Sequence, residues 1–273
     1  MGFSGRKSRC CLPLYADAGI KSGKEKFDTR KFKCVHMSWE PEIEKLFNIT
    51  EGEVFEKATL DSLFKLMDSG YIDSFEFPIS TGKEGNVFRA ICKNKFIAVK
   101  IYRINTVTFR NISKYLMYEP PRNVKKNKRS IIFTWALKEF NNLKKLYEAG
   151  IRVPKPIARE GNVIVMEYIG TAKKPAPLLK DAEIKDAEKI FKKIEEYMEK
   201  MYKKVGLVHA DLSEYNILVY RGSPVIIDVG QTVSKDNPMA LEFLKRDVKN
   251  ITKFFSRFMS IDENEILNRI LEG

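Results

Sequence analysis

The 273-residue chain has few cysteines and no long apolar run, and each of these scarcities excludes a class of protein. Its four cysteines include the adjacent pair Cys10 and Cys11 and form no C-x-x-C motif, so neither a disulfide framework nor a zinc ribbon is indicated. No run of eighteen apolar residues is present to span a membrane, and the first residues lack the apolar centre of a secretory signal. The N-myristoylation pattern also fails, because it needs Ser or Thr where Arg6 stands. We therefore expect a cytoplasmic protein.

The positive charge of the chain is confined to two segments. The net charge is +13, of which residues 1–33 contribute +6 and residues 103–130 contribute +7, so the remainder is balanced. Local basic patches of this kind are typical of proteins that bind the phosphate backbone of a nucleic acid. The alternative is that both segments are flexible and only increase solubility.

Apolar periodicity predicts an antiparallel sheet among helices. Strands are expected over residues 71–79, 85–92 and 95–103, with a turn at Lys93 and Asn94. Helices are expected over residues 38–47 and 59–70, the second capped by Thr59 and ended by Gly70. Further along, we expect a turn between two strands at 160–162, a loop and strand over 207–220, a buried strand over 223–230, and helices over 133–150, 181–205, 237–258 and 263–271. The helix over 133–150 is indicated by apolar residues at spacings of three and four, namely Phe133, Leu137, Phe140, Leu143 and Tyr147, and by Gly150 at its end.

A glycine-bearing turn, STGKEGNV, joins the first two predicted strands over residues 80–87. Gly82 and Gly85 allow the backbone to approach a phosphate closely. The turn resembles the glycine-rich loop of protein kinases, with Ser80 in place of the first glycine. The other common phosphate loop is excluded because the chain contains no G-x-x-x-x-G-K-[ST] sequence.

Lys100 ends an apolar strand thirteen residues after Val87. By itself such a lysine is typically an edge charge whose stem covers apolar surface. After a glycine-rich hairpin it is placed to pair with the α- and β-phosphates of ATP, and it then needs an acidic partner. Glu139 is the candidate, with Glu148 as a weaker substitute, although a solvated helix charge is the default interpretation of either residue.

Two acidic loops complete the pattern. His209-Ala210-Asp211, followed by Asn216, forms an H-x-D-x-x-x-x-N sequence, and Asp228 stands at the end of an apolar strand seventeen residues after Asp211. In that arrangement Asp211 accepts or orients the attacking hydroxyl group, while Asn216 coordinates Mg²⁺. Asp228 bridges the metal to the β- and γ-phosphates, and oxygen ligands suit this hard cation.

The segments STGKEGNV, AVKIYR, VHADLSEYNILV and IIDVGQ together resemble the RIO family of atypical serine/threonine protein kinases, and its Rio-one branch fits best. The resemblance extends from about Thr59 to the C-terminus. Gly85 and Gly230 depart from the residues typical of the family, but neither departure removes a catalytic group. The resemblance implies an α+β, two-lobed protein-kinase-like fold with an antiparallel sheet and a helix in the N-lobe. The C-lobe would be reduced, mainly helical, and without the usual activation segment and peptide-binding subdomains.

With this fold the chain divides into four parts. We expect a basic, flexible N-terminal tail over residues 1–35 and N-terminal helices over 36–70. The kinase N-lobe would follow over 71–168 with a basic flexible loop at 103–130, and the reduced C-lobe over 169–273.

Family membership also implies cofactors, activities and partners. ATP with Mg²⁺ or Mn²⁺, autophosphorylation on Ser, and ATPase activity with Asp228 as a transient phosphoaspartate are expected. The implied role is a switch in maturation of the small ribosomal subunit and its rRNA, contacted through residues 1–33 and 103–130, with no membrane partner. The implied catalytic residues are Lys100, Glu139, Asp211 and Asp228, and the implied metal ligands are Asn216 and Asp228. The implied nucleotide-binding residues are Ser80, Gly82, Lys83, Gly85, Val87, Lys100, Met166, Glu167, Ile169, Ser213 and Asn216.

Three features predict that the chain acts poorly on free peptides. Ala210 replaces the arginine that in many kinases pairs with a phosphorylated activation loop, and no A-P-E motif follows Asp228. Only 45 residues remain after Asp228, too few for the helical subdomains that grip peptides. A macromolecular partner is therefore expected to complete the site. The motifs also leave open a small-molecule phosphotransferase of the aminoglycoside-kinase type, or a non-catalytic RNA-binding scaffold with a kinase fold.

Overall fold

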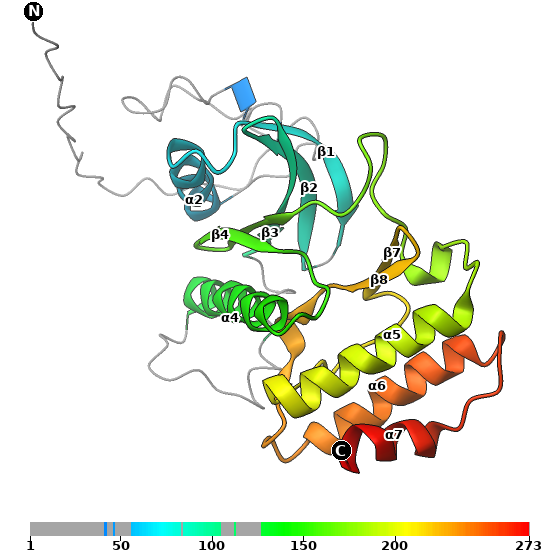
Figure 1. Cartoon of the computed structure of the whole chain (residues 1–273). Coiled ribbons are helices and arrows are strands. Elements are labelled where there is room, and N and C mark those ends of the chain that lie inside the picture. The colour runs from blue at the N-terminus through cyan, green and yellow to red at the C-terminus, as the bar shows by residue number, and fades with distance from the viewer. Residues whose placement is uncertain are drawn as a thin grey trace, which may run out of the picture. The chain divides into compact units, whose positions relative to one another are not determined.

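Five antiparallel strands form the sheet of the amino-terminal part of the protein (Figure 1). The computed structural model describes residues 41, 42, 46, 56–82, 84–104, 112 and 127–272. The sheet order is β1-β2-β3-β5-β4, so β5 pairs with β3 and β4 lies at the edge of the sheet. The strands are β1 (Ser74–Thr81), β2 (Gly85–Cys92), β3 (Lys95–Tyr102), β4 (Pro156–Glu160) and β5 (Val163–Glu167).

Tight turns set the register of this sheet. Lys93 and Asn94 both have positive φ, 49° and 60°, as a two-residue hairpin turn requires, and they place Cys92 opposite Lys95. Gly161, with φ of 51°, makes the corresponding turn between β4 and β5. The predicted meander and the predicted turn at residues 160–162 are confirmed.

Helix α2 (Lys57–Asp68) packs on β4 and β5. Its N-cap is Glu56, so the prediction that Thr59 caps the helix was wrong. Thr59 lies inside the first turn and is buried, where its hydroxyl group accepts a hydrogen bond from Nδ2 of Asn162 at 2.8 Å. Gly70, with φ of 69°, ends the helix as predicted.

Helix α4 (Lys128–Glu148) begins five residues earlier than predicted, because Asn127 caps it by accepting a hydrogen bond from the Ser130 N–H. Of the apolar residues that indicated this helix, Leu143 is buried, whereas Leu137 and Tyr147 are each 41% exposed. The buried face is instead formed by Ile132, Trp135, Ala136, Glu139, Asn142, Leu143 and Leu146. Two of these buried side chains, Glu139 and Asn142, are polar, and both of them reach the candidate site.

The carboxy-terminal part is mainly helical. Helix α5 (Ala187–Lys200) begins later than the predicted residue 181, because Asp186 caps it. It continues into a π-helical turn, η3 (Met201–Val205), which ends at Gly206 as predicted. Helices α6 (Ala240–Phe255) and α7 (Glu263–Glu272) run beside it (Figure 1). The shorter elements are η2 (Leu179–Asp181), β6 (Leu207–Val208), β7 (Ile217–Tyr220), β8 (Ser223–Ile226), η4 (Val229–Gln231) and β9 (Val233–Ser234).

The main hydrophobic core joins α4 to the helices and short strands of the carboxy-terminal part. Phe191 of α5 and Phe255 of α6 pack edge to face within it, with ring centroids 5.3 Å apart. This core therefore fixes α4 against the loops that follow β6 and β8, which carry the predicted acidic residues.

Among the described helices, none combines the length and the apolar character needed to cross a membrane.

Candidate active site

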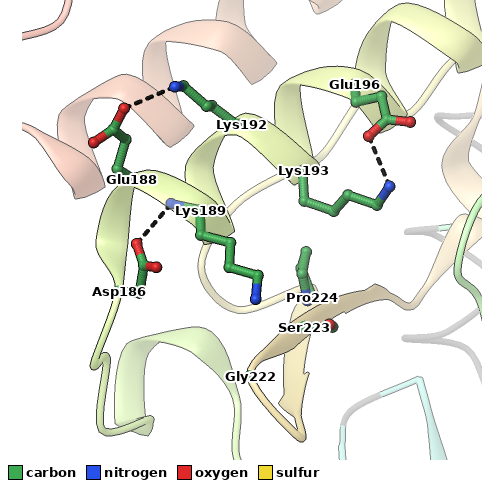
Figure 2. A pocket seen from close by; sticks show the side chains of 9 residues that line it. All are labelled: Asp186, Glu188, Lys189, Lys192, Lys193, Glu196, Gly222, Ser223 and Pro224. Carbon is green, nitrogen blue, oxygen red and sulfur yellow. Dashed lines mark hydrogen bonds and ion pairs between the residues drawn. The ribbon is translucent and has the colours of Figure 1, made fainter.

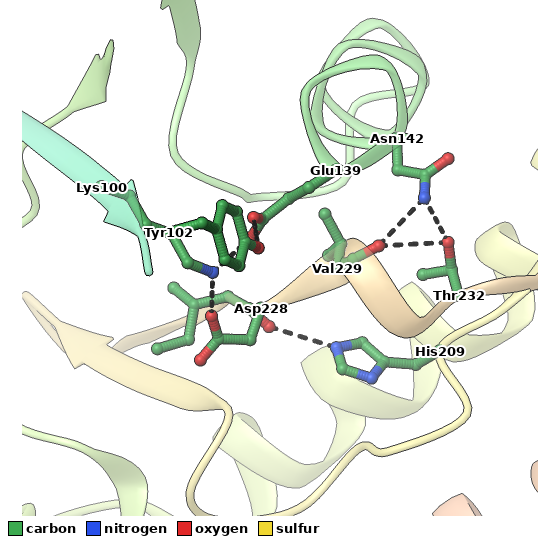
Figure 3. Close-up of polar contacts among 9 residues, drawn as sticks. Lys100, Tyr102, Glu139, Asn142, His209, Asp228, Val229 and Thr232 are labelled. Atoms are coloured by element: carbon green, nitrogen blue, oxygen red, sulfur yellow. Dashed lines mark hydrogen bonds and ion pairs between the residues drawn. The ribbon is translucent and has the colours of Figure 1, made fainter. Parts of the chain in front are cut away.

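Lys100 lies between two carboxylates from distant parts of the chain (Figure 3). Its Nζ is 2.8 Å from Oε1 of Glu139 on α4 and 2.6 Å from Oδ1 of Asp228, which follows β8. Lys100 and Glu139 are 9% and 2% exposed, whereas the side chain of Asp228 is 48% exposed. The predicted Lys100–Glu139 pair therefore forms, and the same lysine contacts the predicted Asp228.

Electrostatics keep these groups charged. Burial disfavours the charge on Lys100, but the carboxylates of Asp228 and Glu139 outweigh burial and hold the pKa of Lys100 well above its ordinary value. The Lys100 ammonium in turn lowers the pKa of Asp228. The hydroxyl group of Tyr102 donates to Oε2 of Glu139, and burial together with the Glu139 charge raises the pKa of Tyr102, so the phenol keeps its proton.

Helix α4 also holds the loop that follows β8. Nδ2 of Asn142 donates to the carbonyl oxygen of Val229 at 3.0 Å and to the hydroxyl oxygen of Thr232 at 2.5 Å. Gly230 packs against the indole of Trp135, where an added Cβ would lie 3.0 Å from Nε1. The helix that supplies Glu139 thus also fixes the backbone next to Asp228.

Asp211 lies in the loop between β6 and β7, and Asn216 folds back onto it. Residues 209–216 are called the catalytic loop below, after the role predicted for them. Nδ2 of Asn216 donates to the carbonyl oxygen of Asp211 at 2.7 Å and lies 3.3 Å from its Oδ2. Burial raises the pKa of Asp211, the Arg246 guanidinium opposes this, and the negative charge of Asp228 raises it further. Asp228 is thus among the charges that act on Asp211.

Helix α6 holds the main chain on both sides of the catalytic-loop aspartate. Asp247 accepts the N–H groups of Ala210 and Leu212 at 2.8 and 2.9 Å, while Arg246 donates to the carbonyl of Ala210 and Asn250 donates to that of Leu212. These bonds stabilise Ala210 at φ of 68°, a left-handed conformation that costs a residue with a Cβ about 1 kcal/mol. Burial raises the pKa of Asp247 to about 7, against the opposing effect of its hydrogen bonds.

His209 joins the catalytic loop to the end of β8. Its Nε2 lies 3.1 Å from the carbonyl oxygen of Ile227, the residue before Asp228. Burial lowers the pKa of His209 to about 4, so the ring is neutral near pH 7 and its Nε2–H is the donor.

The register of the sheet brings three predicted nucleotide-binding residues onto one face. Val87 lies directly opposite Lys100, and Met166 lies opposite Ala98, two residues before Lys100. Opposite residues and residues two apart share a face of an antiparallel sheet. Val87, Lys100 and Met166 therefore face the same side.

The turn between β1 and β2 lies next to this face. Exposed Ser80 pairs with Val87, and the Gly82 N–H donates to the carbonyl of Gly85 at 2.9 Å. A Cβ on Gly85 would lie 2.3 Å from the carbonyl oxygen of Ile101, so this approach of two strands needs glycine. Lys83, also predicted to contact phosphate, lies outside the described residues.

Glu167 and Ile169 lie at and just beyond the end of β5. The N–H of Glu167 donates to the carbonyl of Lys155 at 2.8 Å, and the carbonyl of Ile169 accepts the N–H of Ala176 at 3.0 Å. The carboxylate of Glu167 binds both Nη atoms of Arg152, at 2.7 and 2.6 Å. The N–H of Glu167 and the carbonyl of Ile169 are therefore already bonded within the protein.

Ser213 lies in the turn between Asp211 and Asn216. Its carbonyl accepts the Asn216 N–H at 3.0 Å, and its hydroxyl oxygen accepts the Tyr215 N–H at 3.4 Å. These bonds fold the catalytic loop so that Asn216 reaches back to Asp211.

A separate hollow of about 480 Å³ lies between α5 and the β7–β8 turn (Figure 2). Two of its lysines are paired with carboxylates of the same helix, Lys192 with Glu188 and Lys193 with Glu196, each at 2.7 Å. None of the predicted site residues lines this hollow. The candidate site is therefore the cluster around Lys100, Asp211 and Asp228.

The chemistry of the donors fits Mg²⁺. Within the part of the chain that the structure describes, no three His, Cys, Asp or Glu side chains gather to form an all-protein metal cage. Mg²⁺ is commonly bound by one or two carboxylates together with substrate phosphates and water. The carboxylate of Asp228 and the amide oxygen of Asn216, whose Nδ2 is occupied by Asp211, are donors of this kind.

Three supporting residues were not predicted from the sequence. Tyr102 reads as an apolar strand residue, although its position two residues after Lys100 places it on the same face of β3. Asn142 lies one helical turn beyond Glu139, a spacing that could have indicated a shared face. Asp247 resembles an ordinary charge on α6, and no local signal marks it as buried.

Comparison with known proteins identifies the family. Residues 86–266 match the family model described as the RIO domain. The chain belongs to the RIO family. The RIO-type serine/threonine-protein kinase Rio1 of Haloferax volcanii is 44% identical over 225 residues, which cover 82% of this chain and 77% of that protein. Its counterpart in Methanocaldococcus jannaschii is 44% identical over 209 residues, covering 76% and 72%.

These relatives show that this family member is a serine/threonine protein kinase. The fold agrees with solved structures. The Rio2 kinase of Chaetomium thermophilum, solved as an ADP/Mg²⁺-phosphoaspartate complex, superimposes with a TM-score of 0.61 at 24% identity, covering 83% of this chain and 75% of that one. The expected two-lobed, kinase-like α+β fold is confirmed.

Proposed function

We propose that this RIO kinase uses ATP and Mg²⁺, phosphorylates itself on Ser, hydrolyses ATP, and acts as a switch in maturation of the small ribosomal subunit. One observation carries the catalytic part of the proposal: Lys100 contacts both Glu139 and Asp228, which lie in distant parts of the chain. A buried lysine held by one carboxylate and touching a second, half-exposed carboxylate is suited to bind phosphate groups beside a metal.

The phosphates would bind beneath the β1–β2 turn. Lys100 would exchange its contact with Asp228 for oxygens of the α- and β-phosphates, while Glu139 keeps the ammonium in place. Gly82 and Gly85 carry no Cβ, which favours close approach of their main chain to the phosphates. Ser80 and Lys83 supply further polar contacts.

Adenine would bind at the end of β5. The carbonyl of Glu167 accepts the exocyclic amino group, and the N–H of Ile169 donates to the ring, because the other two groups of these residues are already bonded within the protein. Val87 and Met166 lie on the face of the sheet that covers the base.

Asp228 and Asn216 would hold Mg²⁺, which neutralises charge on the transferred phosphoryl group. Asp211 accepts the proton of the attacking hydroxyl group, and its pKa, raised by burial, suits a general base. Ser213, in the same loop, would lie next to the γ-phosphate. In the ATPase reaction the phosphoryl group passes to a carboxylate oxygen of Asp228 as ADP leaves, and water then releases phosphate.

The ribosomal role depends on residues 1–33 and 103–130. Their combined charge accounts for the whole net charge of +13 and suits the phosphate backbone of rRNA. Both segments lie largely outside the described residues, so the support for this part is the charge pattern and the family. A precursor particle would also supply contacts to the substrate.

The test is ATP turnover with and without precursor small-subunit particles, in the wild type, Asp211→Asn and Asp228→Asn. Asp262→Asn is a matched control, because this residue caps the start of α7 away from the site and Asn preserves the cap. We expect the particles to stimulate the wild type and both site variants to lose at least about a hundredfold in rate. Wild-type turnover in both site variants would refute the catalytic assignment, and unchanged turnover with particles would refute the partner.

A further inference from the structure

A line of buried polar side chains runs from α2 to the phosphate-binding lysine. Thr59, Asn162, Tyr102, Glu139 and Lys100 are each at most 9% exposed. Burying polar groups costs free energy unless each finds a hydrogen-bonding partner. A continuous row of such groups ending at the candidate site therefore calls for a functional explanation.

The first link in this line fixes the carboxylate of Glu139. Its Oε1 accepts from Lys100 and its Oε2 accepts from the Tyr102 hydroxyl, so both oxygens have a donor (Figure 3). The ring of Tyr102 also lies 4.9 Å from Nζ of Lys100. Without the hydroxyl group, Oε2 would lose this donor and the carboxylate could rotate away from the lysine.

The second link fixes the main chain of Tyr102, whereas the first link involves its hydroxyl group. Nδ2 of Asn162 donates to the carbonyl of Tyr102 at 2.6 Å, and the carbonyl of Asn162 accepts the N–H of Tyr102 at 3.0 Å. Since a carbonyl group only accepts, the first bond fixes the orientation of the Asn162 amide. The same Nδ2 donates to the hydroxyl oxygen of Thr59 on α2 at 2.8 Å.

Helix α2 lies before residue 86, where the match to the RIO family model begins. It is nevertheless connected to the Lys100–Glu139 pair, through hydrogen bonds from Asn162 to Thr59 and to the main chain of Tyr102. The hydroxyl group of Tyr102 then completes the path to Glu139. The contacts of α2 with β4 and β5 hold Thr59 against the turn that carries Asn162.

We propose that Tyr102 is a positioning residue for the Lys100–Glu139 pair, and that α2 sets its position through Thr59 and Asn162. The hydroxyl group of Tyr102 keeps the Glu139 carboxylate turned toward Lys100, and α2 keeps the end of β3 in register. The inference rests on the proposed function, because it assigns these residues to the phosphate site of an ATP-dependent kinase.

The experiment compares hydroxyl deletions that preserve shape. Tyr102→Phe removes the donor to Glu139, and Thr59→Val removes the acceptor for Asn162. Ser62→Ala is the matched control, because Ser62 is also a buried hydroxyl residue on α2 but donates only to Ala58 within its own helix, at 2.7 Å. For each variant, kcat/KM for ATP and the rise in melting midpoint caused by Mg²⁺-ATP are measured.

The rise in melting midpoint separates positioning from a purely structural role. A structural loss lowers the midpoint equally with and without nucleotide, whereas a misplaced Lys100 reduces the increment that the nucleotide adds. We expect Tyr102→Phe to lose about tenfold in kcat/KM and Thr59→Val about threefold, both with a smaller increment. Ser62→Ala should match the wild type. The double variant should be no worse than Tyr102→Phe, since Thr59 acts through Tyr102.

Retention of kcat/KM within about twofold in Tyr102→Phe would overturn the role of its hydroxyl group. Equal values for Thr59→Val and Ser62→Ala would overturn the link to α2. If Tyr102→Phe does not fold, the comparison of Thr59→Val with Ser62→Ala decides alone. Lys100→Met distinguishes failure of the proposed function from failure of this inference. Wild-type turnover in Lys100→Met contradicts the proposed function. An inactive Lys100→Met beside a fully active Tyr102→Phe contradicts only this inference.

Discussion

The ion pair between Lys100 and Glu139 makes a quantitative prediction about stability. Lys100→Met leaves the carboxylate of Glu139, 2% exposed, without the ammonium 2.8 Å away. Removing one partner of a buried pair costs about 3–5 kcal/mol, because the other charge stays buried without compensation. For a protein of this size that corresponds to a fall of about 10 °C in melting midpoint.

A second substitution should restore part of this loss. Glu139→Gln in the Lys100→Met background removes the uncompensated charge, so the double variant should be about 2 kcal/mol more stable than Lys100→Met alone. Glu139→Gln alone should cost only about 1–2 kcal/mol, because Lys100 keeps Asp228 as its partner. Phosphoryl transfer should be severely impaired in all three variants. The double variant should thus regain stability without regaining activity.

The assay is urea denaturation of the four proteins, with phosphoryl transfer measured in parallel. Lys65→Met is the control: Lys65 lies 2.8 Å from Glu160, but these side chains are 67% and 36% exposed, so the cost should stay below about 1 kcal/mol. A Lys100→Met variant within about 1 kcal/mol of the wild type would refute the reasoning. A double variant less stable than Lys100→Met would refute it as well.

Three further predictions concern residues around the two acidic loops. Asn142→Leu removes the donor to Val229 and Thr232, so we expect a loss of about 2 kcal/mol in urea denaturation and a several-fold higher Mg²⁺ requirement in a metal titration of turnover. Asp247→Asn leaves one acceptor oxygen for two N–H donors and should cost about 2–3 kcal/mol in the same denaturation assay, whereas Asp186→Asn, at the exposed N-cap of α5, should cost less than about 0.5 kcal/mol. The pKa of His209 is about 4 in the folded protein and about 6.5 in the unfolded chain, so the unfolded chain binds a proton first as the pH falls. The stability of the wild type relative to His209→Gln should therefore fall by about 2–3 kcal/mol between pH 7 and 4.5. His209→Gln should lack this component, and parallel stability curves for the two proteins would contradict the assignment.

The amino-terminal sheet was predictable because its signals are local. Lys93 and Asn94 suit positive φ, and the strands on either side alternate or run apolar. The partner of Lys100 could also be found from the sequence, through the order of the motifs. Periodicity alone would have left Glu139 on the surface of its helix.

The buried face of α4 could not be predicted from apolar periodicity. Glu139 and Asn142 lie on the inner face because Lys100 and the loop after β8 supply partners that are far away in sequence. Leu137 and Tyr147 are left exposed for the same reason. Asp247 was missed in the same way, since its partners are main-chain N–H groups more than thirty residues away.

The roles of Thr59 and Tyr102 were hidden by local plausibility. Thr59 looks like an N-cap because a hydroxyl residue stands at the start of a helical pattern, yet its partner is Asn162. Tyr102 completes an apolar strand, and nothing in the pattern indicates that its hydroxyl group meets a carboxylate. Tertiary hydrogen bonds decide both positions.

The most direct test of the central claim is a crystal structure of the protein with Mg²⁺ and a non-hydrolysable ATP analogue. The account predicts a metal ion bound by Asp228 and Asn216, Lys100 on the α- and β-phosphates, and the γ-phosphate within reach of Asp211. An analogue bound elsewhere, with the 2.6 Å Lys100–Asp228 contact intact and no metal at Asp228, would contradict it.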